Sequence, residues 1–201
     1  MELNDTDVKT RILLSAKRLF AKQGYEGTSV RQICEEANAN IALISYHFGG
    51  KEKVFEAIFE HFYPGNEQAI NQYEDQLKDP VEGLALIVRE IIAFTINDKE
   101  LSDIVQQELT LQSPRMATVQ AFLAPVWFKV RDLLKRGKEE GVFHFDSHTT
   151  AFLTVMGVAL SHKKFSSVNV WLKDNDAVIP DSYPDQAARF VLQGLGVKCD
   201  S

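Results

Sequence analysis

The sequence predicts an all-α protein in two parts, a small N-terminal domain of short helices and a larger C-terminal helical bundle. Apolar residues recur at three- and four-residue intervals along the chain, and no alternating strand pattern interrupts them. Turn-forming residues at 24–27, 38–40 and 49–50 divide the first part into short helices. Pro64-Gly65 is the clearest break, so we place the domain boundary there and expect domains over residues 1–64 and 65–201.

Composition excludes several classes of protein. The chain has 201 residues, of which 45% are hydrophobic and 25% charged, as in an ordinary globular protein. No apolar run is long enough to cross a bilayer, and the acidic N-terminus lacks the features of a signal peptide, so we expect a cytoplasmic protein without a membrane partner. Cys34 and Cys199 are too few and too far apart in the sequence to imply a disulfide framework or a zinc cluster.

The net charge of −6 is unevenly distributed. Residues 1–63 carry 8 Lys and Arg against 9 Asp and Glu, and the remainder carries 14 against 19. A nearly neutral N-terminal segment can still present a basic face to a nucleic acid. Charge therefore neither establishes nor excludes DNA binding.

Four helices are expected in the N-terminal part. The first begins after residues 5–7, whose short oxygens can cap it, and has an apolar face formed by Ile12, Ala16, Leu19 and Phe20. Thr28 or Ser29 caps a short second helix, and a third covers residues 41–48. Lys51 opens the fourth, with Val54, Phe55, Ile58, Phe59 and Phe62 on its buried side.

The C-terminal part reads as a helical bundle. After a polar segment at 66–78, we expect helices from 79–80 onward, over about 98–112, from 113–114 to 137 or 141, from 146–147 onward and over about 185–195, with a loop at 173–184. His144 and His148 are four residues apart, but the first falls in a loop, so we predict no metal site. We likewise predict no cofactor.

The stretch from Thr28 to Lys53 is the most informative about function. It holds two short helices joined by about three residues, the proportions of a helix-turn-helix. A generic helical hairpin has similar proportions, so the turn alone does not decide between them. The outer side of the second helix is small or polar, whereas Ile44 and Phe48 face the core.

At this point the sequence resembles the TetR family of repressors. The resemblance is carried by Thr-Ser-Val-Arg-Gln-Ile at 28–33, Glu-Glu-Ala-Asn-Ala-Asn at 35–40 and Ile-Ser-Tyr-His-Phe-Gly-Gly-Lys-Glu at 44–52. It covers about residues 8–66. The resemblance implies a TetR-like fold, with an N-terminal three-helix DNA-binding domain that contains the helix-turn-helix and a C-terminal helical bundle. It also implies DNA contacts by Ser29, Arg31, Asn40, Ile41, Ala42, Ser45, Tyr46, His47 and Lys51.

Individual contacts have simpler alternatives. Tyr46 could be a half-buried aromatic residue, and Arg31 could pair with Glu35, although that pairing could also orient it toward DNA. His47 could lie on the surface without touching DNA. Ile41 replaces the lysine of many relatives, which favours an apolar contact such as one with a thymine methyl group.

The resemblance also implies partners. We expect a homodimer that binds a palindromic double-stranded operator and is released by an effector, with a small apolar effector contacting Phe94, Phe122 and Trp127. Those aromatic residues could equally form a filled core, and the C-terminal part could bind a protein instead. An all-α enzyme is disfavoured, because no convergent acid, base, nucleophile or metal set is evident.

Overall fold

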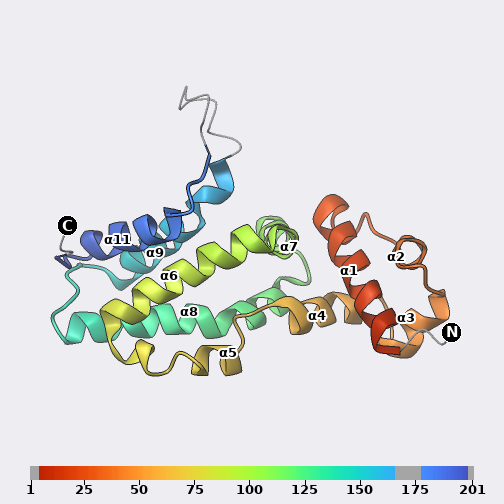
Figure 1. The fold of residues 1–201 in the computed structure, drawn as a ribbon, viewed down its shortest axis with the longest axis horizontal. Helices are drawn as coiled ribbons and strands as arrows, with labels where there is room; N and C mark the ends of the chain where they lie inside the picture. Colours follow the sequence, from red (N-terminus) through yellow and green to blue (C-terminus); the bar gives the residue numbers. More distant parts are fainter. Residues whose placement is uncertain (1–4, 166–177, 199–201) are drawn as a thin grey trace. The chain divides into compact units, whose positions relative to one another are not determined.

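A computed structural model describes residues 5–165 and 178–198, and within these ranges the regular structure is entirely helical (Figure 1). The chain forms two compact units. The N-terminal unit contains Met1–Pro64 and Asp98–Phe122, and the C-terminal unit contains Gly65–Asn97 and Leu123–Ser201. The chain therefore passes between the units three times. The boundary predicted at Pro64-Gly65 is the first of these passages, and residues 98–122, expected in the C-terminal domain, pack with the N-terminal helices.

The C-terminal unit is built around α6. Its elements are α5 (Glu67–Asn71), η1 (Gln76–Lys78), α6 (Pro80–Asn97), the later part of α8 (Met116–Glu139), α9 (His148–Leu160), η2 (Ser161–Lys164) and α11 (Tyr183–Gly194). Asp79 caps α6 by accepting hydrogen bonds from the backbone N–H groups of Val81 and Glu82. α6 packs against η1, α9 and α11. Its buried face supplies Leu84, Ile87, Val88 and Ile92 to the core of the unit.

One proline lies inside a helix where the sequence pattern did not place it. Pro184 was assigned to a loop, but α11 already begins at Tyr183, because proline is tolerated in a first helical turn. The described part of that predicted loop is therefore 178–182, and residues 173–177 lie outside the described residues. Pro125 lies within α8, just after the chain enters the C-terminal unit.

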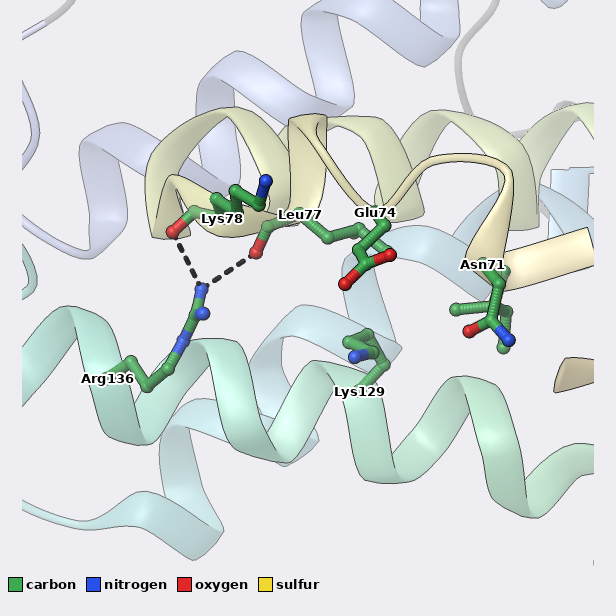
Figure 2. Close-up of a pocket in the computed structure, with 7 residues that line it drawn as sticks. Asn71, Glu74, Leu77, Lys78, Lys129 and Arg136 are labelled. Atoms are coloured by element: carbon green, nitrogen blue, oxygen red, sulfur yellow. Dashed lines mark hydrogen bonds between the residues drawn. The ribbon is translucent and has the colours of Figure 1, made fainter.

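Arg136 of α8 forms hydrogen bonds with the backbone of η1. Its guanidinium donates to the carbonyl oxygens of Leu77 at 2.8 Å and Lys78 at 3.1 Å (Figure 2). These carbonyls end a short helix and need donors. The contact holds the segment before α6 against the long helix.

The N-terminal unit contains α1 (Asp5–Gln23), α2 (Val30–Ala37), α3 (Ile41–His47) and α4 (Lys51–Phe62). The helices agree with the sequence prediction, although the side chains proposed to cap α1 lie outside the described residues. The shared core contains Ile12, Ala16, Phe20, Ile33, Ile44, Val54, Phe55, Ile58 and Phe59. Apolar packing thus holds α2 and α4 against α1, and α3 against α2.

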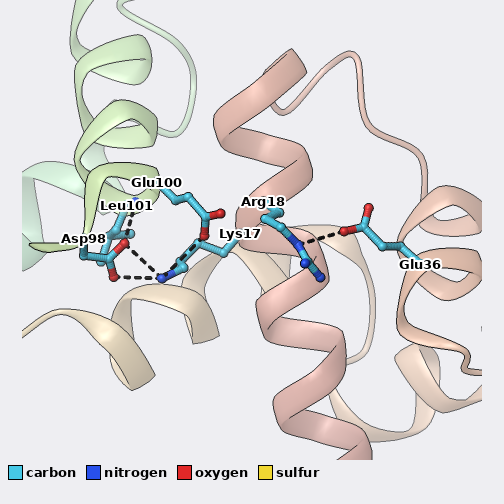
Figure 3. A network of polar contacts seen from close by, with 6 residues as sticks. All are labelled: Lys17, Arg18, Glu36, Asp98, Glu100 and Leu101. Atoms are coloured by element: carbon cyan, nitrogen blue, oxygen red, sulfur yellow. Dashed lines mark hydrogen bonds and ion pairs between the residues drawn. The ribbon is translucent and has the colours of Figure 1, made fainter.

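α7 (Lys99–Leu111) and the first turns of α8 complete this unit. Lys17 of α1 forms an ion pair with Asp98, which precedes α7 (Figure 3). Gln107 donates to the carbonyl oxygen of Ala21 at 2.7 Å, and the ring of Phe122 stacks on that of Phe59 at 5.2 Å. Polar and aromatic contacts therefore join residues 98–122 to α1 and α4.

The described residues contain neither a membrane span nor a metal cluster. Within 5–165 and 178–198, no helix is both long and apolar enough to span a bilayer. The same residues contain no cluster of three His, Cys, Asp or Glu side chains arranged to hold a metal ion.

Candidate nucleic-acid interface

The turn between α2 and α3 spans three residues, as the sequence predicts. Asn38 has φ 48° and ψ 52°, a left-handed conformation that asparagine tolerates better than most residues. Ala39 then donates its backbone N–H to the carbonyl of Cys34 at 2.9 Å, which closes the end of α2. Asn40 begins α3, because its side-chain oxygen accepts from the backbone N–H of Ala42 at 2.9 Å.

A capping box fixes the start of α2. The Ser29 hydroxyl accepts from the Gln32 backbone N–H at 3.2 Å, and the Gln32 side-chain oxygen accepts from the Ser29 N–H at 2.8 Å. Thr28, the other candidate cap, is buried and donates to the carbonyl of Gly24. Ser29 is therefore the cap, and the backbone N–H groups of this helix start lie beside its exposed side chain.

The nine residues expected at DNA all lie at or near the surface. His47 and Lys51 are half-buried, and the other seven are exposed: Ser29, Arg31, Asn40, Ile41, Ala42, Ser45 and Tyr46. They come from the start of α2, from α3 with its cap, and from the start of α4. Ile44 is buried, which orients the opposite side of α3 outward.

Three of these nine residues lie together around one surface hollow. Arg31, Asn40 and Ile41 line one shallow hollow together with Glu35 at the outer side of the helix-turn-helix. Arg31 also forms the expected ion pair with Glu35 at 2.8 Å, and this carboxylate raises the pKa of Arg31. The pair is fully solvated, so it orients the guanidinium more than it stabilises the fold.

The aromatic residues at the end of α3 are arranged side by side. The Tyr46 side chain is 80% exposed, so the alternative of a half-buried packing residue is excluded. Its ring meets that of His47 edge-on, with centroids 4.9 Å apart. A tyrosine hydroxyl at such a position can donate to a phosphate oxygen.

Lys51, at the start of α4, lies against an aromatic ring and near a second cation, neither of which the sequence predicts. Its ammonium lies 3.9 Å from the centroid of the Tyr25 ring, and the guanidinium of Arg115 lies 3.8 Å from the same centroid. Partial burial lowers the pKa of Lys51, and the positive charge of Arg115 lowers it further. The role of Arg115 could not be predicted from the sequence, because this residue is far from Tyr25 along the chain and belongs to no local motif.

The aromatic residues proposed for an effector are divided between the two units. Phe122 belongs to the N-terminal unit and stacks on Phe59, whereas Phe94 and Trp127 are half-buried in the C-terminal unit.

The C-terminal unit has two adjoining surface grooves beside α8. The first, with a volume of about 170 Å³, is lined by Ile70, Asn71, Glu74, Leu77, Lys78, Lys129 and Arg136 (Figure 2). The second, of about 350 Å³, shares Ile70, Asn71 and Lys129 with it and adds the exposed Phe128. Neither groove is lined by Phe94 or Trp127, and both mix charged with apolar side chains.

Two short helices, a three-residue turn and a second helix whose outer face is exposed opposite the buried Ile44 define a helix-turn-helix DNA-binding protein. Residues 12–58 match the family model described as bacterial regulatory proteins, tetR family. The chain is 33% identical over 144 residues to the uncharacterised HTH-type transcriptional regulator YxaF of Bacillus subtilis, covering 67% of this chain and 74% of YxaF. The chain therefore belongs to the TetR family of bacterial transcriptional regulators, as the sequence motifs indicated.

Other relatives are similar over less of their length. The probable HTH-type regulator YttP of Bacillus subtilis is 34% identical over 107 residues, 52% of each chain. The HTH-type transcriptional repressor NicS of Pseudomonas putida is 28% identical over 141 residues, 69% of this chain and 66% of NicS. The chain thus matches about half of YttP and just under two thirds of NicS.

The similarity to solved structures extends over nearly the whole chain. The crystal structure of HlyIIR, a hemolysin II transcriptional regulator, has a TM-score of 0.76 and 25% sequence identity, covering 97% of this chain and 100% of that one. This agreement includes the C-terminal helices, for which the sequence offered only length and helical character. The predicted TetR-like, all-α fold is confirmed.

Proposed function

We propose that the protein is a sequence-specific DNA-binding repressor that acts as a two-fold homodimer and is released from its operator by an effector. The observation that carries the proposal is the outward set of nine residues on α2, α3 and the start of α4, supported from behind by the buried Ile44. The name of NicS, a repressor, supports the direction of regulation. Such a protein acts on chromosomal DNA in the cytoplasm.

The proposed contacts divide into two kinds. Tyr46, His47 and Lys51 carry a hydroxyl, an imidazole and an ammonium suited to phosphate oxygens, which position the protein without reading sequence. Asn40, Ile41, Ala42 and Ser45 would face base edges in the major groove, and Ser29 and Arg31 would lie at its margin. Because the side-chain oxygen of Asn40 already caps α3, its NH₂ group is the part available to a base.

A second copy of the chain is the proposed partner of α9 and α11. The two helices pack against each other, yet each exposes a large apolar side chain, Leu153 on α9 and Phe190 on α11. Large apolar side chains left exposed on two packed helices are candidates for contact with a second copy. A two-fold dimer would cover the patch on both protomers and set the separation of their recognition helices.

The effector is proposed to bind the C-terminal unit. Phe94 and Trp127 are half-buried there. Phe122, the third aromatic residue proposed for the effector, belongs to the N-terminal unit. An effector releases DNA only if it binds the DNA-incompetent state more tightly. In a Trp171→Phe background, Trp127 is the sole tryptophan, so its fluorescence can be titrated with candidate ligands while operator affinity is measured in parallel.

DNA selection tests the central proposal. The protein is incubated with a library of random duplexes, and the retained sequence is compared with DNA upstream of its own gene by fluorescence anisotropy. A palindromic consensus bound far more tightly than a scrambled duplex is expected. Equal affinity for the selected and scrambled duplexes would exclude sequence-specific regulation.

Two substitutions separate the kinds of contact. Lys51→Ala should weaken binding to selected and scrambled duplexes alike and reduce the slope of log affinity against log salt by about 0.9 per protomer. Ser45→Ala should instead change which sequence is selected, because it removes a group facing the bases. An unchanged salt slope in Lys51→Ala would show that this ammonium does not contact phosphate.

A further inference from the structure

The ring of Tyr25 lies at the centre of a cationic cluster behind the DNA-facing helices. The Lys51 ammonium and the Arg115 guanidinium both lie within 4 Å of its centroid. The ring is itself held by aromatic neighbours, with centroid distances of 5.3 Å to Phe20 and 5.6 Å to Phe55. Each cation gains from the electron-rich face of a ring that cannot easily move.

Arg115 forms ion pairs with two carboxylates and also lies over the Tyr25 ring. It lies in the turn between α7 and α8, and its side chain is only 11% exposed. One nitrogen is 2.9 Å from Glu26, and another is 3.2 Å from the buried Glu108. The hydroxyl of Ser113 also donates to Glu108, so the arginine is fixed from its own turn. These contacts lie within the N-terminal unit.

Glu26 is the carboxylate that would compete with a DNA phosphate for the Lys51 ammonium. Its side chain is 80% exposed, and its charge acts on Lys51 in the direction opposite to that of Arg115. A carboxylate freed from Arg115 would attract the nearby ammonium and hold it away from a phosphate oxygen. Arg115 prevents this by pairing with Glu26 while its own positive charge repels Lys51.

We propose that Arg115 is a positioning residue for DNA binding, which pairs with Glu26 and so leaves the Lys51 ammonium available to the phosphate backbone. The proposal rests on the DNA-binding function proposed above and extends it to a residue outside the helix-turn-helix. It makes the α7–α8 turn a functional part of the DNA-binding unit.

Arg115→Gln is the direct test, measured by fluorescence anisotropy with the selected duplex and a scrambled duplex. We expect affinity for both to fall by about ten-fold at physiological salt, and the log–log salt slope to fall by about 0.9 for each phosphate that Lys51 no longer neutralises. Arg131→Gln is the matched control. It removes the same charge from an arginine stacked on Phe128, 4.9 Å from the ring centroid in the other unit, and should leave both quantities unchanged.

Glu26→Gln distinguishes positioning from general destabilisation. In the wild-type background it should tighten binding only slightly, whereas in the Arg115→Gln background it should restore most of the lost affinity. A purely structural role of Arg115 would not be rescued by removing the carboxylate. Arg115→Lys retains the positive charge but loses the planar guanidinium that reaches both carboxylates, so it should recover only part of the affinity lost in Arg115→Gln.

A measurement without DNA separates this inference from the proposed function. In protein reductively methylated with ¹³C, NMR titration should show the pKa of Lys51 rising in Arg115→Gln, because a repelling charge is lost and Glu26 is freed. An unchanged pKa, or an equal gain from Glu26→Gln in both backgrounds, would overturn the proposal. Failure of the wild-type protein to bind any duplex, with the expected change at Lys51, would instead overturn DNA binding.

Discussion

The ion pair between Lys17 and Asp98 joins α1 to the start of α7, and its removal should have a large effect on stability. The Lys17 ammonium lies 2.9 and 2.8 Å from the two carboxylate oxygens of Asp98 (Figure 3). It also lies 4.4 Å from the centroid of the Phe62 ring. The side chains of the pair are 9% and 22% exposed. Asp98 also accepts from the backbone N–H of Leu101 at 3.1 Å, which caps α7.

Lys17→Met keeps the aliphatic stem but leaves the carboxylate without its cation. Breaking a fully buried pair costs about 3–5 kcal/mol, whereas an exposed pair contributes about 0–1 kcal/mol. The low exposure places this pair nearer the buried limit, and the remaining cap on Asp98 reduces the penalty. We therefore expect a loss of about 2–3 kcal/mol in the free energy of unfolding.

Asp98→Asn should cost less, about 1–2 kcal/mol, because Lys17 retains Glu100 at 3.7 Å and asparagine caps helices as well as aspartate does. The double variant contains no unpaired buried charge and should lie within about 1 kcal/mol of wild type. Urea unfolding followed by circular dichroism, at one protomer concentration, provides the measurement. Additive losses in the double variant would refute the reasoning, because they would mean that the two charges are not coupled.

Four further outcomes are expected. Asn38→Ala should destabilise the protein by about 1 kcal/mol while Asn38→Gly does not, measured by thermal unfolding, because only the first strains a left-handed residue. Gly137→Ala should cost about 1–3 kcal/mol, because its Cβ would lie 2.1 Å from a ring carbon of the buried Phe143. Phe190, 64% exposed, should be needed for assembly, so that Phe190→Glu is monomeric by light scattering where the wild type is dimeric. Burial lowers the pKa of His162, so the unfolded chain takes up its proton first, and stability should fall as the pH drops through about 6.5, less steeply in His162→Gln.

The helix-turn-helix could be predicted because its determinants are local. Ser29, Asn38 and Asn40 supply two helix caps and a left-handed turn within twelve residues, and each acts on backbone atoms at most four residues away. Ile44 could be oriented from helical spacing alone. The exposed side of α3, which we propose to face DNA, follows from these signals, so most of the candidate site could be predicted from the sequence.

The support behind Lys51 could not be predicted in the same way. Arg115 meets Glu26 across 89 residues of sequence, and neither residue belongs to a periodic apolar pattern. Lys17 and Asp98 are separated by 81 residues and would ordinarily be assigned to solvated faces. Charged residues give no signal of burial until their partners are known. The membership of α7 in the N-terminal unit was missed for this reason.

These long-range pairs change how a signal from the C-terminal unit would reach DNA. A single connection at Pro64-Gly65 would act through α4 alone, whereas the chain passes between the units at three points. Asp98 immediately follows one passage and is held by Lys17 of α1. Arg115 lies seven residues before another and contacts the ring beneath Lys51. An effector that displaced the end of α6 or the later part of α8 is therefore expected to act on α1 and on the proposed phosphate contact of Lys51 together, because each displaced segment leads directly to one of these paired residues. The switch proposed for this regulator is thus expected to alter the orientation of the helix-turn-helix and the position of Lys51 in a single step.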